Sequence, residues 1–231
     1  MVLGLISAIA ACPAIIGTTE AVRQGQSQNK RQSHRGRKSN LLVTCSDPSK
    51  KARSVNGGTV VLRNNKFYVT TVNPKARYGF NADDEDDDEK PETERPNEKG
   101  HLFAGYFFAY PDKKWGPRGD GYVTTIADDP PQLNWVYVDK DTYEIKYGLR
   151  ADSEGHLVGP WNCSPIDKRL TFDGWEGFTV VETERDSDCW QLYFDVDDDG
   201  LETKVPLDRR IMEIELTRKE MRMRKGDSIL G

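Results

Sequence analysis

The sequence predicts a mainly β protein, folded as a single antiparallel β-sandwich or partly closed barrel with an N-terminal helix and a short C-terminal helix. Two stretches support this most strongly: WVYVDKDTYEIKYG, from Trp135, and CWQLYFDVDDDG, from Cys189. In each, bulky residues alternate with polar ones and then stop at a turn, which is typical of a half-buried β-hairpin. Each also carries the spacing Tyr-x-Asp-x-Asp, starting at Tyr137 and at Tyr193.

Composition fits one large domain with polar appendages. The 231 residues are 36% hydrophobic and 31% charged, so a core can form only if the excess of polar residues lies outside it. Two segments hold that excess, a basic arm and an acidic run. The formal net charge of -5 provides no overall attraction to nucleic acid. No repeat period recurs along the chain, which argues against a solenoid or a propeller.

Residues 1–22 form the predicted N-terminal helix, an apolar segment with no charged side chain before Glu20. The favoured interpretation is a helix of small residues that packs on the protein or dips into a membrane surface. A signal peptide would need a basic start, which is missing, although Ala8-Ile9-Ala10 offers a cleavage site. A membrane span would need about 20 strongly apolar residues, and glycine, serine and proline dilute this run. Both stay open as alternatives.

Residues 23–39 form a basic arm that contains no acid. Such an arm binds anionic lipid headgroups or phosphate backbones. It has no aromatic side chain to stack on bases, which argues against nucleic acid. An apolar segment followed directly by a basic one is the two-signal arrangement of peripheral membrane binding, and a solvated linker is the alternative. The candidate residues for binding an anionic surface are Arg23, Lys30, Arg31, Arg35, Arg37 and Lys38.

The predicted β domain spans residues 40–216 and begins with three short β-branched runs before residue 72. Asn64-Asn65 joins the second run to the third, because asparagine tolerates the positive φ of a tight hairpin turn. Residues 82–100 follow, and they contain seven consecutive acids that repel one another. We predict a disordered surface loop there.

The rest of the domain contains more strand signals, separated by loops. The segment Asp128-Asp129-Pro130-Pro131 is expected to interrupt the strand, because proline cannot donate a backbone hydrogen bond. Thr217 and Glu220 match a capping box, so a short basic helix is expected to open the tail 217–231. The strands are predicted at 102–110, 122–126, 135–147 (a hairpin), 169–172, 178–182, 190–196 and 212–216.

The second hairpin resembles half of a calcium-binding loop. Asp195, Asp197 and Asp199, followed by Gly200, match the first half of an EF-hand loop. The twelfth position of that loop must be a bidentate glutamate, and here it is Pro206. We therefore expect a solvated Asp-Gly turn and no metal site at this hairpin.

The two hairpins together allow another interpretation. Strand alternation would place Asp139 and Asp141 on one face. If the hairpins are neighbours, their carboxylates would form one rim, as a glycosidase or a calcium site requires. The candidate rim residues are Asp139, Asp141, Asp195, Asp197 and Asp199.

No motif predicts catalysis or a cofactor. The chain has no G-x-S-x-G, phosphate-binding loop, dinucleotide-binding glycine pattern or zinc module, so no catalytic residue, metal ligand or cofactor is predicted. None of Cys12, Cys45, Cys163 and Cys189 forms a CxxC pair. The cysteines are expected to be reduced and mostly buried, with a Cys163–Cys189 disulfide as the alternative if the protein is secreted.

The segment MVLGLISAIAACPAIIGTTEAVRQGQ, the arginine-rich arm and the stretch WVYVDKDTYEIKYGLRAD resemble a family of uncharacterised proteins of filamentous ascomycete fungi. The resemblance covers most of the chain, with the acidic run as a variable insertion. It implies a eukaryotic setting, and no activity or catalytic residue can be carried over from it.

These observations favour a non-enzymatic, β-rich interaction module, located inside the cell and held at a membrane surface by its apolar N-terminus and basic arm. One alternative is a secreted carbohydrate-binding protein or hydrolase that uses the hairpins rich in aspartate and tryptophan. A second alternative is a nucleic-acid binder that uses the basic arm, which the acidic run disfavours. The protein partner is not predicted.

Overall fold

The structure is a computed structural model that describes residues 34–70, 100–111, 115–128, 131–184 and 189–221. The predicted N-terminal helix, most of the basic arm and nearly all of the acidic run lie outside these residues. The chain divides into two units, 1–36 and Arg37–Gly231, and the β domain belongs to the second.

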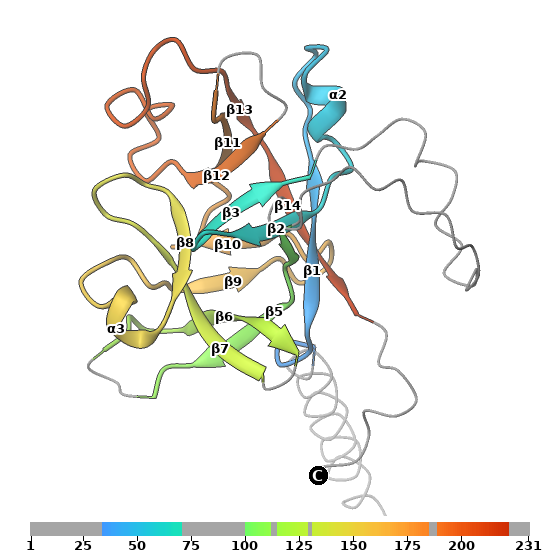
Figure 1. The fold of residues 1–231 in the computed structure, drawn as a ribbon. Helices are drawn as coiled ribbons and strands as arrows, with labels where there is room; N and C mark the ends of the chain where they lie inside the picture. The colour runs from blue at the N-terminus through green and yellow to red at the C-terminus, as the bar shows by residue number, and fades with distance from the viewer. Residues whose placement is uncertain (1–33, 71–99, 112–114, 129–130, 185–188, 222–231) are drawn as a thin grey trace, which may run out of the picture. The chain divides into compact units, whose positions relative to one another are not determined.

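Within the described residues, the second unit is a fourteen-stranded antiparallel sheet with two short helices, α2 (Ala52–Val55) and α3 (Arg150–Ser153) (Figure 1). The strands are β1 (Ser39–Thr44), β2 (Val60–Arg63), β3 (Lys66–Val69), β4 (His101–Leu102), β5 (Gly105–Ala109), β6 (Asp120–Asp128), β7 (Pro131–Val138), β8 (Ile145–Gly148), β9 (Trp161–Cys163), β10 (Leu170–Phe172), β11 (Phe178–Glu182), β12 (Trp190–Phe194), β13 (Ile211–Glu213) and β14 (Glu215–Glu220).

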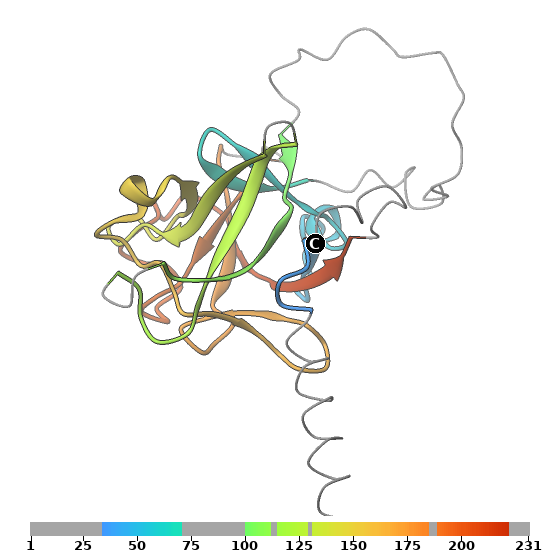
Figure 2. The same cartoon turned by 90° about the horizontal axis from the view of Figure 1, so that it is seen from below.

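The sheet nearly closes into a barrel through its last two strands. Its main path begins at β13, which pairs with β11, and ends at β14, which pairs with β1. Only Ile214 separates β13 from β14 along the chain, so one continuous stretch joins both ends of the path. Seen from below, the strands are arranged around a common centre (Figure 2). The predicted partly closed barrel is therefore confirmed, and the two-sheet sandwich is not formed.

Aromatic side chains fill the core. Trp161 and Trp190 are fully buried, and Trp161 packs edge to face on Phe172 with ring centroids 4.7 Å apart. Phe172 in turn packs on Phe194 at 4.8 Å. Edge-to-face packing of this kind adds about 0.5–1.5 kcal/mol per pair to the burial of apolar area. These rings come from β9, β10 and β12, so the core ties together strands far apart in sequence.

The predicted turn between β2 and β3 is confirmed. Asn64 and Asn65 have φ values of 50° and 61°, the left-handed conformation that asparagine tolerates. The turn also supports the next hairpin, because the carbonyl of Asn65 accepts a hydrogen bond from the backbone of Tyr147 at 3.0 Å.

The predicted helix at the start of 217–231 is wrong, because its first four residues complete strand β14. Thr217 pairs with Leu42, and the pairing with β1 continues to Glu220 opposite Ser39. Arg218 is buried and donates from Nε to the Ser39 hydroxyl at 3.0 Å. Residues 222–231 lie outside the described part of the chain. The sheet thus runs from Ser39 to Glu220 and exceeds the expected limits of 40–216 at both ends.

The three cysteines of the described residues are thiols. Cys189 accepts a hydrogen bond from Arg63 at 3.2 Å, and Cys163 lies 3.9 Å from a guanidinium nitrogen of Arg218. The alternative Cys163–Cys189 disulfide is therefore not formed. Burial raises the pKa of the Cys45 thiol, which keeps it protonated.

Candidate functional site

The two Tyr-x-Asp-x-Asp segments are neighbours in the fold, but only the first is a hairpin. The predicted hairpin turn at Asp199-Gly200 is wrong, because β12 pairs with β11 and β3 and is followed by a loop that reaches β13. The backbone N–H of Phe194 donates to the carbonyl of Tyr143 at 3.0 Å, and Glu144 forms an isolated bridge with Tyr193. The hydroxyl of Tyr143 donates to Asp197 Oδ2 at 2.6 Å. The two segments are therefore close enough for their carboxylates to share one rim.

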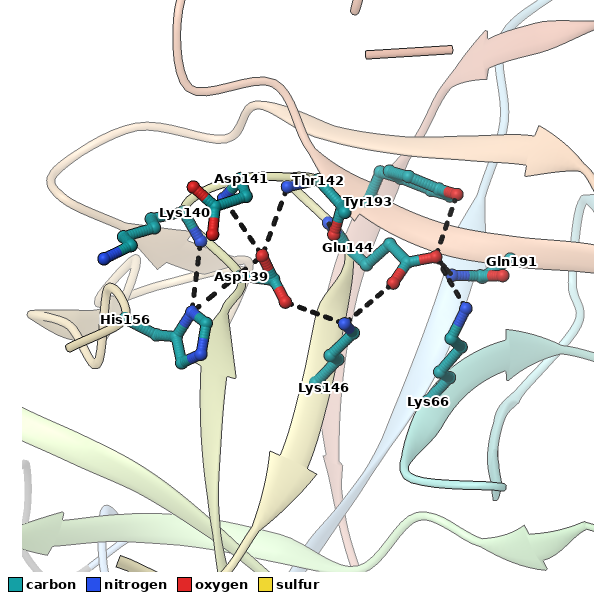
Figure 3. Close-up of polar contacts among 10 residues, drawn as sticks. All are labelled: Lys66, Asp139, Lys140, Asp141, Thr142, Glu144, Lys146, His156, Gln191 and Tyr193. Atoms are coloured by element: carbon teal, nitrogen blue, oxygen red, sulfur yellow. Dashed lines mark hydrogen bonds and ion pairs between the residues drawn. The ribbon is translucent and has the colours of Figure 1, made fainter. Parts of the chain in front are cut away.

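In the first hairpin, the carboxylate of Asp139 is used by its own turn (Figure 3). Oδ1 accepts the backbone N–H groups of Asp141 at 3.0 Å and Thr142 at 3.2 Å, and Oδ2 accepts Lys146 Nζ at 2.7 Å. Burial favours the neutral acid, but hydrogen bonds from Lys146 and the turn outweigh it and hold the pKa of Asp139 at about 2. Asp139 is buried and ionised at neutral pH.

Asp195 plays the same part in the loop that follows β12. It is buried, and its carboxylate accepts the backbone N–H groups of Asp199 at 3.3 Å and Gly200 at 2.7 Å. Such contacts fix a loop, as asparagine and aspartate side chains commonly do in turns. The hydrogen bond to Asp197, together with burial, raises the pKa of Tyr143 to about 12, so this tyrosine is a donor at neutral pH.

Two of the five predicted rim residues, Asp139 and Asp195, therefore hold the backbone of a turn. Asp139 and Asp141 do not share a face: β7 ends at Val138, Asp139 points into the turn and Asp141 is exposed. Asp197 and Asp199 are also exposed. Among the described residues, no group of three or more His, Cys, Asp or Glu side chains is placed to hold a metal ion.

A buried glutamate, which no sequence pattern marked, joins three strands beside this turn (Figure 3). Glu144 Oε1 accepts from Lys66 Nζ at 2.6 Å, Gln191 Nε2 at 2.8 Å and the Tyr193 hydroxyl at 3.3 Å. Lys146 Nζ lies 3.0 Å from Oε2. Burial opposes ionisation of Glu144, but these donors outweigh burial and lower its pKa. The local sequence could not identify this network, because its members come from β3, β8 and β12.

A cleft of about 760 Å³ opens where the chain changes partners between β13 and β14. It is lined by the end of β1 with Ser46 and Asp47, by residues 175–179, by the loop of Asp195, and by residues 211–215. Its volume lies within the range of about 300–1,000 Å³ typical of ligand sites. None of the described residues that line it is lysine, arginine or histidine. Six are acids: Asp47, Glu176, Asp195, Asp198, Glu213 and Glu215.

Four of these six acids are engaged within the fold. Asp47 accepts the backbone N–H of Ser49 at 2.7 Å, and Asp195 fixes its own loop. Arg169, which does not line the cleft, reaches Glu176 and Glu215 at 3.3 Å each. The two remaining acids, Asp198 and Glu213, are exposed, and no described residue pairs with either carboxylate.

A second surface feature is a cluster of aromatic side chains on β5, on β7 and on the connection between β5 and β6. Trp115 packs edge to face on Trp135 at 4.6 Å, and Tyr110 stacks on Trp135 at 5.8 Å. Phe108 is 42% exposed and contacts the same tryptophan. The Arg150 guanidinium lies over Trp115 at 5.1 Å. The cluster is partly open to solvent and carries one cation.

The described part of the basic arm is short. Arg37 is exposed and pairs with Glu220 at 3.2 Å, Lys38 is exposed, and Arg35 is half-buried. Arg23, Lys30 and Arg31 lie outside the described residues, so binding to an anionic surface stays a prediction. Of the helices that the structure describes, none is both long and apolar enough to cross a membrane.

The model of the fungal β-trefoil domain family matches residues 17–222, most of the chain. No curated protein and no solved structure is significantly similar to the chain. The nearly closed antiparallel barrel agrees with the fold that the family name states, and β-trefoil domains often mediate binding. The chain belongs to the fungal β-trefoil domain family.

Proposed function

We propose that this β-trefoil is a non-enzymatic interaction module that binds its partner in the acidic cleft and is held at a membrane surface by residues 1–38. The observation that carries the proposal is the cleft itself. It has the volume of a ligand site, two of its carboxylates have no partner among the described residues, and no base lines it.

Two observations favour binding over catalysis. The carboxylates that a glycosidase would use, Asp139 and Asp195, accept hydrogen bonds from their own turns. A general acid needs a raised pKa, whereas that of Asp139 is lowered to about 2. These carboxylates therefore act as structural groups.

The membrane part of the proposal rests on the sequence. An uncharged segment of 19 residues precedes an arm with six lysine and arginine residues, and neither signal alone holds a protein firmly. The inner leaflet of the plasma membrane carries the anionic lipids that such an arm binds, which favours an intracellular location.

Photo-crosslinking tests the cleft. A photoreactive residue in place of Glu213, which lines the cleft, should yield discrete adducts in fungal cell extract, and excess unmodified protein should suppress them. The control carries the same residue in place of Leu207, which is 92% exposed and lies outside the cleft. Identical adducts from both positions, or none from position 213, would reject the cleft as the binding site.

The aromatic cluster supports a second candidate function, carbohydrate binding. Sugars bind on exposed aromatic faces, and Trp115 is partly exposed beside Tyr110 and Trp135. An oligosaccharide that binds the wild type and is lost in Trp115→Ala, with the cleft variants unaffected, would favour this candidate.

A further inference from the structure

We infer that the occupant of the cleft is an extended basic peptide, with two lysine or arginine side chains directed at Asp198 and Glu213 and its backbone along β13. The inference rests on the proposed function and adds the chemical class of the partner.

The charge of the cleft favours a cationic ligand. Among the described residues, six acids and no base line the cleft, and Arg169 neutralises part of this charge from outside it. The carboxylates of Asp198 and Glu213 can accept hydrogen bonds from a cationic ligand, and they lie on different segments of the cleft lining. Two separated carboxylates match two cationic groups, whereas an anionic partner such as nucleic acid would be repelled.

Thr179 supplies a second, independent signal. It is 97% buried at 3% exposure and lines the cleft, yet its hydroxyl makes no hydrogen bond within the described chain. Phe178 and Val180, its neighbours on β11, belong to the core, so strand alternation directs Thr179 to the opposite face. The hydroxyl is not among the buried side-chain atoms left without a partner, so it is open to the cleft and can accept a hydrogen bond from a ligand there.

Thr179 and Glu213 stand side by side. They are directly opposite in the β11–β13 register. The flanking pairs, at Phe178 with Ile214 and at Glu182 with Arg210, are hydrogen bonded, so the Thr179–Glu213 pair belongs to the close, non-bonded class. An ammonium group at Glu213 would therefore lie within reach of the Thr179 hydroxyl as well.

The edge of β13 favours a peptide over a small cation. Because Met212 and Ile214 direct their backbone groups toward β11, Ile211 and Glu213 direct theirs away from it. The carbonyl of Glu213 accepts from the Cys45 thiol at 3.6 Å. No hydrogen bond within the described chain uses the N–H of Ile211 or Glu213. Such groups pair with the backbone of an added strand.

Trp175 provides an aromatic surface in the same cleft. Its ring packs on Phe194 with centroids 5.1 Å apart, and it covers Gly177, where a side chain would collide with it. The indole is half-buried and lines the cleft. A lysine or arginine side chain that enters toward Asp198 would pack its methylene stem, or its charge, on this face.

Calorimetric titration with synthetic peptides tests the inference. We expect acetyl-Ser-Lys-Val-Lys-Ser-amide, whose lysines share one face when extended, to bind the full-length protein, and the matching glutamate peptide not to bind. Because the contact is ionic, binding should weaken when salt rises from about 0.02 M to about 0.3 M. The variant Asp198→Asn/Glu213→Gln should lose about tenfold in affinity.

Two further variants act as controls. Glu202→Gln/Asp208→Asn makes the same change in net charge at exposed positions outside the cleft, so its affinity should stay within about twofold of wild type. Thr179→Val should lower affinity about threefold while leaving stability to urea unchanged, because the hydroxyl makes no hydrogen bond within the described chain and valine has a similar shape. If Thr179 had only a structural role, peptide affinity and stability to urea would fall together.

The outcomes distinguish the inference from the proposed function. If the lysine peptide does not bind, or both double variants weaken it equally, the basic-peptide inference is wrong. Adducts from position 213 in the crosslinking experiment would then still support the cleft as a binding site. If neither experiment detects binding, both proposals fail together.

Discussion

Asp139 and Asp195 show how one side chain can fix a whole loop. Each buried carboxylate accepts two backbone N–H groups of the turn that follows it. These two carboxylates therefore stabilise the β7–β8 turn and the loop after β12, and Asp139 also pairs with Lys146, which contacts Glu144 as well. A carboxylate whose folded-state pKa lies below its unfolded value stabilises the fold only while it is ionised.

Stability should depend on pH through Asp139. Its pKa falls from 3.8 to about 2 on folding, so its contribution is complete above about 3.8 and is lost as pH falls toward 2. We expect Asp139→Asn to unfold at lower urea concentration at neutral pH and to lose less stability over that acid range than wild type. The control Asp141→Asn changes an exposed acid of the same turn and should keep the wild-type profile. Parallel profiles for Asp139→Asn and wild type would contradict this account.

Glu144 should contribute more than any exposed ion pair. Glu144→Gln leaves Lys66 and Lys146 without their shared anion, which should lower the free energy of unfolding by about 3 kcal/mol. The matched control is Glu154→Gln, which breaks an exposed pair with Arg150 and should cost less than about 0.5 kcal/mol. Guanidinium unfolding measures both, and equal effects would mean that the buried network is not stabilising.

At the scale of elements, the C-terminal segment shows where local pattern fails. Thr217 and Glu220 fit a helix start, and nothing nearby in the sequence opposes it. The segment forms a strand instead of a helix because β1, about 180 residues away, pairs with it at six positions and Arg218 is buried there. By contrast, the turn at Asn64-Asn65 and the strands around it were predictable, because the signal is entirely local.

A proline at Lys219 distinguishes strand from helix. Lys219 pairs with Asn40, and the bond from Met221 N–H to Lys38 places this pair in the hydrogen-bonded class. Lys219→Pro should therefore lower stability by about 2 kcal/mol, whereas Lys219→Ala should have little effect. In a helix starting at Thr217, position 219 would lie in the first turn and would tolerate proline, so an unchanged Lys219→Pro variant would contradict β14.

At the scale of the whole molecule, closure and the cleft could not be read from the sequence. The strand signals predicted a mainly β domain, but no repeat period revealed a trefoil. The cleft depends on four separate stretches that meet only because residues 211–220 change partners from β11 to β1. Glu213 and Thr179 each look ordinary in their own strand, and only the register places them side by side.

We predict that the full chain binds membranes through residues 1–38. Wild type should co-sediment with anionic vesicles and not with neutral ones, since each basic residue near the surface contributes about 1 kcal/mol. Replacing Lys30, Arg31, Arg35, Arg37 and Lys38 with glutamine should abolish this at physiological salt and leave the far-ultraviolet circular dichroism unchanged. A variant that still binds neutral vesicles would indicate that residues 1–19 span the membrane. A wild type that ignores anionic vesicles would reject the membrane proposal.

Amide hydrogen exchange tests the central claim, that the cleft is where this β-trefoil binds. The full chain is measured alone and with the partner recovered by crosslinking from position 213. The account predicts slower exchange confined to residues 175–179 and 211–215 and to the loop of Asp195, with the rest of the barrel unchanged. Protection that instead covers Phe108, Trp115 and Trp135, with the cleft exchanging as in the free protein, would contradict it.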